Sequence, residues 1–362
     1  SAQQIGKTQD SDAAEVLRRI PGLTIVDDRF VVVRGLAQRY NNVWLNEATT
    51  PSSETDSRAF SFDVLPSSLI DNMMVYKSPS AEVMTKNIPD GNTFNVSYQM
   101  GFNTNATFRS FQLTDGSWKD YLGFGAGVRS LPSSFPSHLG DYSTEEAAAF
   151  TRRINQRWGI NRFTAIPDQK ISLTSHRSFD AGDWKIGNIA NVNWSTGYDY
   201  SETVNNNYIA YDVANDLSRP RFEYNDVRYK NTSKLGALFN WSFMKGDHKY
   251  EFRNFFSQRG VSALTQREGM NYYSDKAIRK WESLYTGRTT YSGQLGGTHT
   301  LQEDINKVDW TAGYAFAAYR EPEDRQFHPR RDEDGLTELL RLRSDALLPG
   351  LEGSRCFARC QL

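Results

Sequence analysis

The chain has 362 residues, enough for two or three ordinary domains, and its 42 basic side chains nearly balance its 43 acidic ones. That balance excludes a global field that would steer nucleic acid to the protein. A mean hydropathy of −0.63 and the lack of a long apolar run exclude a transmembrane helix, but not membrane β-strands, whose residues alternate between lipid and lumen. The only cysteines, Cys356 and Cys360, stand near the end, so no disulfide framework holds the body together.

The first ninety residues predict a small α+β module. Asp12 is expected to cap a helix over Ala13–Ile20, which Pro21 and Gly22 end. Three short strands are expected next, and then a turn of helix from Pro66 through Asp71 that leads into an apolar run. The strands are Leu23–Val26, Phe30–Val33 and Asn41–Leu45, and the apolar run is Met73–Tyr76. This region has no glycine-rich phosphate loop and no Cys/His cluster, which favours a structural role over a catalytic one.

From about residue 90 to residue 320 the pattern changes to strict alternation of apolar and polar residues. The clearest runs are 94–108, 184–200, 235–243 and 308–318, and weaker ones are 171–173, 250–256 and 285–301. These runs predict about seven long strands, in meander order along the chain. The apolar residues of one strand, such as Trp310, Tyr314 and Phe316, should then share one face.

The expected connections between these strands alternate in length. Tight turns are expected near Gly182, Gly246 and Asp304, whereas the polar segments 111–169, 201–229 and 257–281 are expected to be long loops. Short turns on one rim and long loops on the other are typical of an outer-membrane barrel. The runs also exceed the ~5–6 residues of an ordinary strand. A soluble β-sandwich or solenoid remains the alternative from pattern alone.

Five motifs then stand in a definite order in the first eighty residues: AEVLRRIPG (14–22), VVVRGL (31–36), YNNVWLN (40–46), RAFSFD (58–63) and LIDNMMVYKS (69–78). Together they resemble the plug domain of TonB-dependent outer-membrane receptors, most of all the large Gram-negative branch with a carboxypeptidase-like front extension. The alternating strands were deduced without these motifs, so two separate patterns favour one family.

The resemblance implies a fold and a function. The fold is an α+β plug domain, residues 1–89 and incomplete, followed by an antiparallel, mainly β segment that forms the first part of a transmembrane barrel, residues 90–330. The function is that of a receptor in the bacterial outer membrane, surrounded by its lipid, which binds a scarce nutrient such as a metal chelate, a corrinoid or a glycan. Import would draw energy from a TonB-type inner-membrane complex. The resemblance implies no enzyme activity, no catalytic residue, no cofactor and no nucleic-acid partner.

The sequence departs from this family in ways that predict a chain truncated at both ends. The energy-coupling segment should lie ahead of Ser1, and Val83 runs into Met84 without the usual Gly-Gly. Such transporters have about 22 strands, and bacterial barrels close with an even number. We therefore expect a non-functional fragment of a receptor. The alternative is a β-rich surface protein that binds a ligand without transporting it.

The tail, residues 331–362, is atypical because it holds both cysteines and a Leu/Arg-rich stretch, 336–348, for which a helix is expected. One interpretation is an appended interaction helix with a metal or redox pair at Cys356 and Cys360. The other, which we favour, is a frameshifted or chimeric end, because a C-x-x-x-C pair without a partner pair is a weak metal signal.

Few residues suggest themselves as a functional site. The five histidines are scattered, so no metal site is expected. The resemblance makes Arg34 the plug-side half of a lock to glutamates on the barrel wall; without the later strands it should face solvent or pair with a nearby acid. The alternative is a plain strand-end arginine. The resemblance also points a polar loop toward the ligand, although a solvated loop fits equally well. Its candidate residues are Asn46, Thr50, Ser53, Glu54, Asp56 and Arg58.

Overall fold

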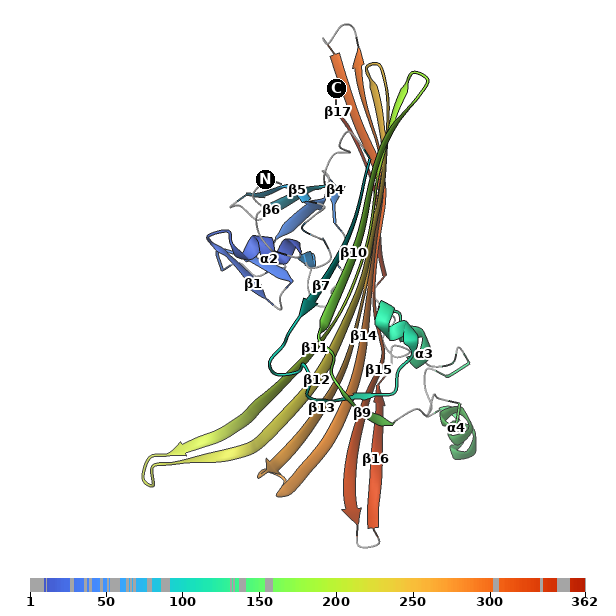
Figure 1. Ribbon diagram of the computed structural model, residues 1–362. Helices are drawn as coiled ribbons and strands as arrows, with labels where there is room; N and C mark the ends of the chain where they lie inside the picture. Colours follow the sequence, from blue (N-terminus) through green and yellow to red (C-terminus); the bar gives the residue numbers. More distant parts are fainter. Residues whose placement is uncertain are drawn as a thin grey trace.

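The computed structural model describes residues 10–361 apart from 11, 27–28, 36–37, 39–40, 46–47, 51, 53–58, 63–64, 66, 68–69, 77–79, 86–91, 131, 133, 137–140, 154–158, 302–305, 333–334 and 344–351. Figure 1 shows three parts. A small front domain, residues 10–85, lies against one side of a long curved sheet. A segment that we call the outer clasp, residues 102–167, lies on the opposite side of the same sheet.

The front domain begins with the predicted capped helix. Helix α2 covers Ala13–Arg18, and the Asp12 carboxylate accepts a hydrogen bond of 3.1 Å from the Glu15 backbone N–H. The strands β1 (Leu23–Val26) and β2 (Phe30–Val33) then pair antiparallel, as the sequence predicts. The helix ends two residues earlier than expected, just before Arg19.

A second, four-stranded sheet completes the front domain in the order β4-β3-β6-β5. Its strands are β3 (Asn42–Leu45), β4 (Ala48–Thr49), β5 (Ile70–Tyr76) and β6 (Ser80–Thr85), with β3 and β6 parallel. The predicted helical turn from Pro66 is wrong at its end, because Ile70 and Asp71 already belong to β5; residues 66, 68 and 69 lie outside the described residues. Ile70 pairs with Thr85 and is buried in the hydrophobic core with Leu17, Phe62 and Leu65, so burial outweighs the local turn signal.

The long sheet is an antiparallel meander, which confirms the predicted order. From one edge it runs β7, β10, β11, β12, β13, β14 and β15, and the last of these pairs with both β16 and β17. The strands are β7 (Thr93–Gly101), β10 (Asp168–Ala181), β11 (Trp184–Asp212), β12 (Leu217–Lys245), β13 (His248–Asn271), β14 (Lys276–Leu301) and β15 (Asn306–Asp332).

Two of the expected long loops are instead continuations of strands. Residues 201–229 and 257–281 extend the hairpins β11–β12 and β13–β14, which turn only at 213–216 and 272–275. Backbone pairing in a hairpin does not require apolar side chains, so polar residues continue the ladder. At 29 residues, β11 spans roughly 95 Å, about three times the thickness of a bilayer core.

The opposite ends of the hairpins carry the predicted tight turns. Two-residue turns at Gly182-Asp183 and Gly246-Asp247 join β10 to β11 and β12 to β13. Both glycines have positive φ, 62° and 53°, which suits the primed turns that match the twist of paired strands. The third expected turn, near Asp304, lies outside the described residues.

The register gives the sheet two different faces. One row across seven strands is Val96, Leu173, Val192, Ala237, Phe256, Tyr291 and Phe316. The next row, on the opposite face, is Asn95, Thr174, Asn191, Leu238, Phe255, Ser292 and Ala315. We call the first the outer face and the second the inner face. The predicted common side for the apolar residues of β15 is confirmed.

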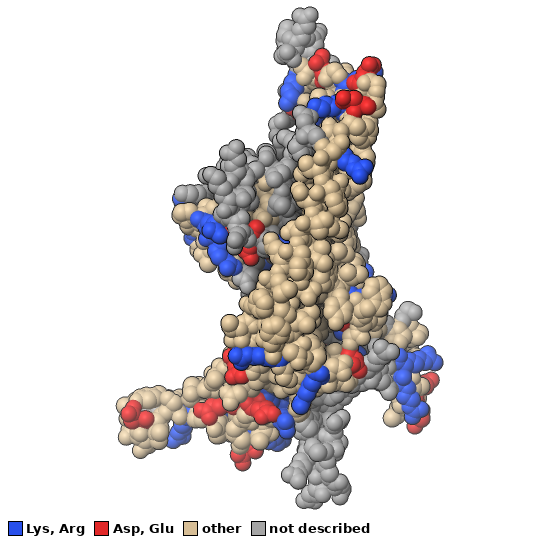
Figure 2. Space-filling model, viewed as in Figure 1, with Lys and Arg blue, Asp and Glu red and all other residues tan. Residues whose placement is uncertain are grey.

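The outer face carries a zone of exposed apolar side chains, the apolar band, near the short turns. It includes Phe94, Val96, Tyr98, Ile171, Leu173, Val192, Phe239, Phe252, Leu295 and Tyr314. In the view of Figure 2, a zone without charged side chains crosses the middle of the sheet, and charged residues gather above and below it. On β11 the band covers residues 186–194, a length of roughly 30 Å.

The front domain covers part of the inner face. The Gln294 side chain donates a hydrogen bond of 3.1 Å to the Leu45 backbone carbonyl, and Phe255 belongs to the same buried cluster as Leu17 and Phe62. Part of the polar face of the sheet is therefore occupied by protein, whereas the apolar band is exposed.

The outer clasp replaces the end of a predicted strand. The expected run to residue 108 stops at Gly101, because the Asn103 carbonyl accepts from two later N–H groups and its side chain accepts from Asn105 N–H at 3.0 Å. The clasp contains β8 (Ser110–Thr114), η4 (Trp118–Leu122), α3 (Ala126–Arg129), α4 (Thr144–Thr151) and β9 (Ile160–Thr164). Phe111 packs on the outer-face residues Tyr198, Tyr229 and Leu264.

The tail adds two strands to the sheet. The helix expected over 336–348 is wrong for residues 336–343, which form a strand, and residues 344–348 lie outside the described residues. Strand β16 (Gly335–Arg343) pairs with the far half of β15, and β17 (Glu352–Gln361) pairs with its near half. Their pairing partner is the otherwise uncovered edge of β15, whose unpaired backbone groups favour strand addition over an isolated helix. Cys356 and Cys360 lie on β17, opposite Tyr314 and Trp310.

Candidate functional site

A cleft of about 720 Å³ lies between helix α2 and the inner face of the long sheet. Its walls come from three parts of the chain that are far apart in sequence. These are helix α2 with its cap, the lower end of β7, and the sheet from the start of β10 through the middle of β11, β12 and β13. The cleft lies beyond the apolar band, on the side of the long hairpins. It forms only because the front domain is docked against the sheet.

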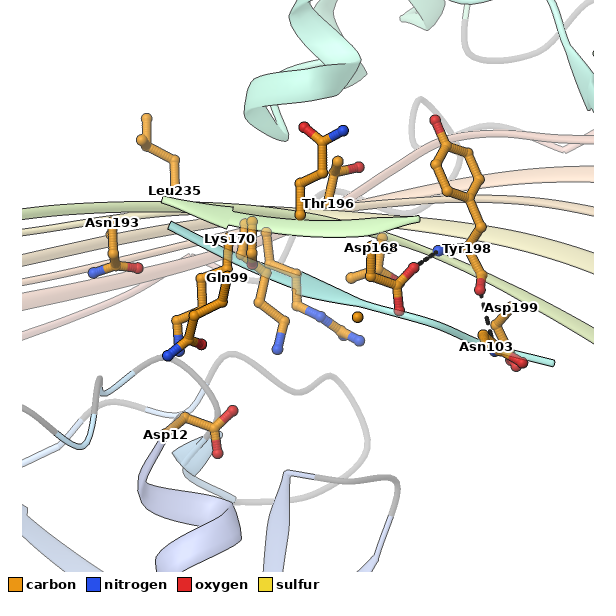
Figure 3. Close-up of a pocket in the computed structure, with 18 of the residues that line it drawn as sticks. Asp12, Gln99, Asn103, Asp168, Lys170, Asn193, Thr196, Tyr198, Asp199 and Leu235 are labelled. Atoms are coloured by element: carbon orange, nitrogen blue, oxygen red, sulfur yellow. Dashed lines mark hydrogen bonds between the residues drawn. The ribbon is translucent and has the colours of Figure 1, made fainter. Parts of the chain in front are cut away.

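Charged groups of opposite sign face each other across the cleft. Helix α2 contributes Asp12 and Glu15, and the sheet contributes Lys170, Lys234 and Arg259. In Figure 3, Gln99, Lys170 and Asn193 point from the sheet toward the front domain, whereas Thr196 and Tyr198 point toward the clasp. Carboxylates on the helix and cations on the wall make the contact complementary, although exposed pairs of this kind each contribute only about 0–1 kcal/mol.

One end of the cleft is organised around Asp168. Its carboxylate accepts a hydrogen bond of 2.9 Å from the Tyr198 backbone N–H, and the Asn103 side chain donates to the Tyr198 carbonyl at 3.2 Å. Burial raises the pKa of Asp168, and nearby Asp199 adds to the rise, while the Tyr198 N–H opposes it. Lys230 forms an ion pair of 3.0 Å with Asp199 at the rim.

The chemistry of this lining suits the binding of a polar solute. Five basic and four acidic side chains line the cleft together with several amides and hydroxyls, and the few apolar residues include Met100 and Leu235. Among the described residues, no group of three His, Cys, Asp or Glu side chains is placed to hold a metal ion. The arrangement offers hydrogen bonds and charge at many points along an open passage.

The structure reaches only part of the predicted ligand loop. Thr50 is described, and its hydroxyl donates a hydrogen bond of 3.1 Å to the Val43 carbonyl, which gives it a structural contact within the front domain. The other candidates, Asn46, Ser53, Glu54, Asp56 and Arg58, lie outside the described residues. Thr50 is not among the residues that line the cleft.

Arg34 is exposed, as expected for this chain. Its backbone adopts a left-handed conformation with φ of 50°, and its N–H donates to the Gly22 carbonyl at 2.9 Å. This hydrogen bond fixes the main chain and leaves the Arg34 guanidinium at the surface. The lock to the wall stays a prediction.

Sequence reasoning missed the residues that line the cleft. In the sequence, the cations of the cleft wall occupy ordinary polar positions of alternating strands. Only their position on the same inner face distinguishes Lys170, Lys234 and Arg259. The histidines, expected to be scattered, include one close pair: the Nδ1 atoms of His248 and His299 are 3.1 Å apart across β13 and β14. The sequence separates these two residues by 51 positions, so only the register reveals the pair.

Comparison with known proteins identifies the front of the chain. Residues 1–91 match the family described as the TonB-dependent Receptor Plug Domain. No curated protein sequence matches. Among solved structures, the ferric enterobactin receptor PfeA in complex with BCV-L6 shows 8% identity and a TM-score of 0.31, over 94% of this chain and 59% of that one.

Two further solved structures are similar at the same level. The siderophore receptor PirA from Pseudomonas aeruginosa shows 10% identity and a TM-score of 0.26, and the outer membrane transporter YddB from Escherichia coli shows 9% and 0.28. Each covers 94% of this chain and 57% of its own length, so the chain spans somewhat more than half of the structures it matches.

The family match confirms the predicted plug domain at the front of the chain, over residues 1–91. It also confirms the predicted fold class, a plug domain followed by an antiparallel sheet. Among the described helices, none is both long and apolar enough to span a bilayer.

Proposed function

Because residues 1–91 belong to the plug-domain family of TonB-dependent receptors, we propose that this chain serves an outer-membrane receptor that takes up a scarce nutrient. One observation supports this above all: the front domain covers the polar inner face of a sheet whose outer face carries an exposed apolar band. A soluble protein would bury those side chains, since contiguous exposed apolar surface is an aggregation hazard in water.

The dimensions of the band support a membrane location for it. A stretch of nine residues on β11 corresponds to roughly 30 Å, close to the ~25 Å apolar zone of outer-membrane barrels. Short turns at one end and long hairpins at the other follow the usual orientation, with the short turns in the periplasm. The cleft between α2 and the sheet then opens on the side of the long hairpins, from which a nutrient would arrive.

The finer points of the proposal concern the nutrient and the energy source. A metal chelate, a corrinoid or a glycan is polar, and the charged, amide-rich cleft suits such a solute. Transport energy would come from a TonB-type complex of the inner membrane. Asn46, Thr50, Ser53, Glu54, Asp56 and Arg58 stay candidates for ligand contact, and the division at residues 89 and 330 stays a proposal.

A pair of substitutions at neighbouring positions of β11 tests the proposal. Val192 lies in the apolar band and Asn193 on the inner face. Val192→Arg should weaken assembly into the membrane by up to about 2–4 kcal/mol, because an arginine would face lipid within the band. Asn193→Arg adds the same charge to the polar side and should leave assembly intact. The measurement is the fraction of full-length chain that floats with phosphatidylcholine vesicles in a density gradient.

The alternative of a surface protein outside the bilayer predicts a different flotation result. If Val192→Arg floats as well as the unmodified chain, or if the unmodified chain stays at the bottom of the gradient, the band does not face lipid. Equal loss in both variants would point to a general folding defect and would also count against a sheet with one lipid face.

A further inference from the structure

A second cavity, of about 400 Å³, lies on the outer face between the clasp and strands β13 to β15. The clasp contributes the aromatic side chains of Trp118 and Phe124 and the cation of Lys119. The sheet contributes Gln258, Thr289 and the cation of Arg320. Lys119 and Arg320 are both exposed, so each can reach a ligand at the mouth of the cavity without first leaving a buried position.

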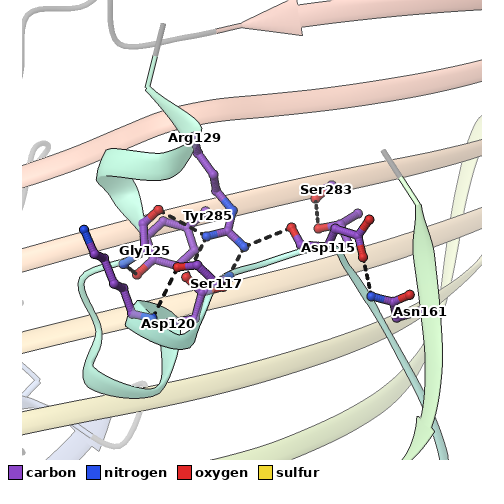
Figure 4. Close-up of polar contacts among 10 residues, drawn as sticks. Asp115, Ser117, Asp120, Gly125, Arg129, Asn161, Ser283 and Tyr285 are labelled. Carbon is purple, nitrogen blue, oxygen red and sulfur yellow. Dashed lines mark hydrogen bonds and ion pairs between the residues drawn. The ribbon is translucent and has the colours of Figure 1, made fainter. Parts of the chain in front are cut away.

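The clasp holds its side of the cavity in a fixed position. The Arg129 guanidinium forms two hydrogen bonds of 2.8 Å to the Asp120 carboxylate and stacks 4.4 Å from the ring of Tyr285. The Tyr285 hydroxyl accepts from the Gly125 N–H at 2.8 Å. Burial raises the pKa of Tyr285 to about 12, so this hydroxyl stays neutral at physiological pH. Figure 4 shows these bonds anchoring the clasp to the sheet.

A second anchor brings the backbone of the clasp against β13. The Gln258 side chain donates a hydrogen bond of 2.6 Å to the Gly123 carbonyl. Gly123 has φ of 80°, and a methyl group on Gly260 would come within 2.7 Å of its Cα. Both glycines are therefore required for this close approach. The cavity is built by the fold and does not depend on a ligand to form.

The cavity lies at the border of the apolar band. Thr289 lies two positions before Tyr291, which shares an outer-face row with the band residue Val192. Phe124 of the clasp stacks on Phe256 of the same row, with ring centroids 6.4 Å apart. Exposed Trp118 and Tyr121 lie on the same stretch of the clasp. Aromatic residues gather at the membrane–water boundary in outer-membrane barrels, which is where this border would be.

On the basis of the proposed membrane location, we propose that this cavity binds a phosphorylated lipid of the outer leaflet. Lys119 and Arg320 contact the phosphate of the headgroup, and Trp118 and Phe124 pack against its sugar or the upper part of its acyl chains. A basic pocket at the level of the headgroups is suited to an anionic lipid, and the long-hairpin side of the band is the outer-leaflet side. A free phosphate would use the cations alone, without the aromatic wall.

Lipid retention by the full-length chain tests the proposal. The chain is extracted from membranes in a mild non-ionic detergent and mixed with diphosphorylated lipid A or with the same lipid after phosphatase treatment. Native mass spectrometry then counts the molecules retained. We expect one molecule of diphosphorylated lipid A to be retained about tenfold more strongly than the dephosphorylated form, because charge-assisted hydrogen bonds to phosphate are lost. Excess inorganic phosphate should not displace it.

Matched variants locate the site. The double variant Lys119→Ala, Arg320→Ala should abolish the preference for diphosphorylated over dephosphorylated lipid A. The control Lys245→Ala, Lys307→Ala removes two exposed lysines at the opposite rim and should preserve this preference. Gly260→Ala keeps every charge but displaces the clasp, and it should also lower retention. If the first pair of substitutions folds poorly, Gly260→Ala and the phosphatase comparison still decide the question.

Several results would overturn the inference. These are equal retention of both lipids, unchanged retention in the Lys119/Arg320 variant, or displacement by inorganic phosphate. Vesicle flotation of the same preparation separates the two proposals. A chain that enters phosphatidylcholine vesicles but shows no phosphate preference refutes the lipid site alone, and a chain that does not enter refutes the membrane location and the lipid site together.

Discussion

The front domain and the long sheet place their apolar residues in opposite ways. In the front domain, Leu17, Phe62 and Leu65 are at most 2% exposed and form one contiguous core. In the sheet, Phe94 is 68% exposed, Val96 64% and Leu295 52%, although the strands that carry them are paired with their neighbours in the sheet. The first region stabilises itself by burial inside, whereas the second holds its shape through backbone pairing and exposes its apolar residues.

The difference shows that apolar periodicity does not specify what an apolar face will contact. The inner face of the sheet is covered by the front domain through Gln294 and Phe255, and one part of the outer face is covered by the clasp. The apolar band near the short turns is covered by neither and is exposed. Where the outer face becomes polar, at Thr196, Asn231 and Ser233, the clasp covers it and these residues bond to one another.

The largest effect is expected where the clasp is anchored. Arg129→Ala should leave the half-buried Asp120 carboxylate without its cation and should cost about 3–5 kcal/mol locally. The expected result is rapid proteolysis within residues 102–167, with the long strands and the front domain intact. Asp120→Asn with Arg129→Gln, which keeps a neutral hydrogen-bonded pair, should recover part of the protection. Equal loss of protection throughout the chain would show that the clasp is not a separate unit.

Removal of one leucine from each region tests the contrast directly. Leu17→Ala should destabilise the front domain by roughly 2–5 kcal/mol, because a fully buried side chain leaves a cavity. Leu295→Ala should cost under about 1 kcal/mol in detergent. The Leu295 side chain contacts an apolar environment whether or not the strand is folded, so its removal changes the free energy of unfolding little. The measurement is hydrogen exchange of helix α2 and of strand β14. Similar costs at the two positions would contradict the different origin of stability.

A smaller effect is expected from the carboxyl group at the end of the cleft. Burial raises the pKa of Asp168 above its ordinary value of 3.8, so the folded protein binds this proton more tightly than the unfolded chain does. The stability that protonated Asp168 contributes is fully present at a pH below its ordinary pKa, and it is lost as the pH rises through the raised pKa of the folded protein. Asp168→Asn should therefore stabilise the protein near neutral pH and not below pH 4.

The measurement for Asp168 is the urea midpoint of the detergent-solubilised chain across this pH range. Asp199→Asn serves as the control, because it removes the neighbouring charge and leaves the Tyr198 hydrogen bond in place. A gain for Asp168→Asn that does not depend on pH would mean that its ionisation does not affect stability.

The smallest effect is expected at Arg34. Arg34→Ala should change stability by no more than about 0.5 kcal/mol, since the side chain is exposed. Arg34→Gly should raise the free energy of unfolding by about 0.5–1 kcal/mol, because glycine adopts the positive φ of this position without strain. Urea denaturation of the front domain checks both values. If either variant instead loosens the front domain from the sheet, as seen by proteolysis of the interface, the predicted lock is at work in this chain.

Much of the candidate site could not be predicted from the sequence. Asp12 was identified as a helix cap, and it is one, but its place in the cleft depends on how the front domain docks. Lys170, Lys234 and Arg259 come together through the register of four strands. The loop chosen for ligand contact is largely outside the described residues, and Thr50 has a structural contact instead.

By itself, the sequence determined much of the local structure and predicted the plug domain at the front of the chain. Alternation with a period of two specified long strands with two unlike faces, and Gly182 and Gly246 specified the turns between them, because both properties depend on neighbouring residues. The tertiary structure alone decided how far each hairpin extends, that the tail adds strands and no helix, and that residues 102–167 fold onto the outer face. The first two outcomes depend on backbone pairing between strands. The third depends on packing between residues more than a hundred positions apart, such as Gly123 with Gly260 and Arg129 with Tyr285, which no local pattern encodes.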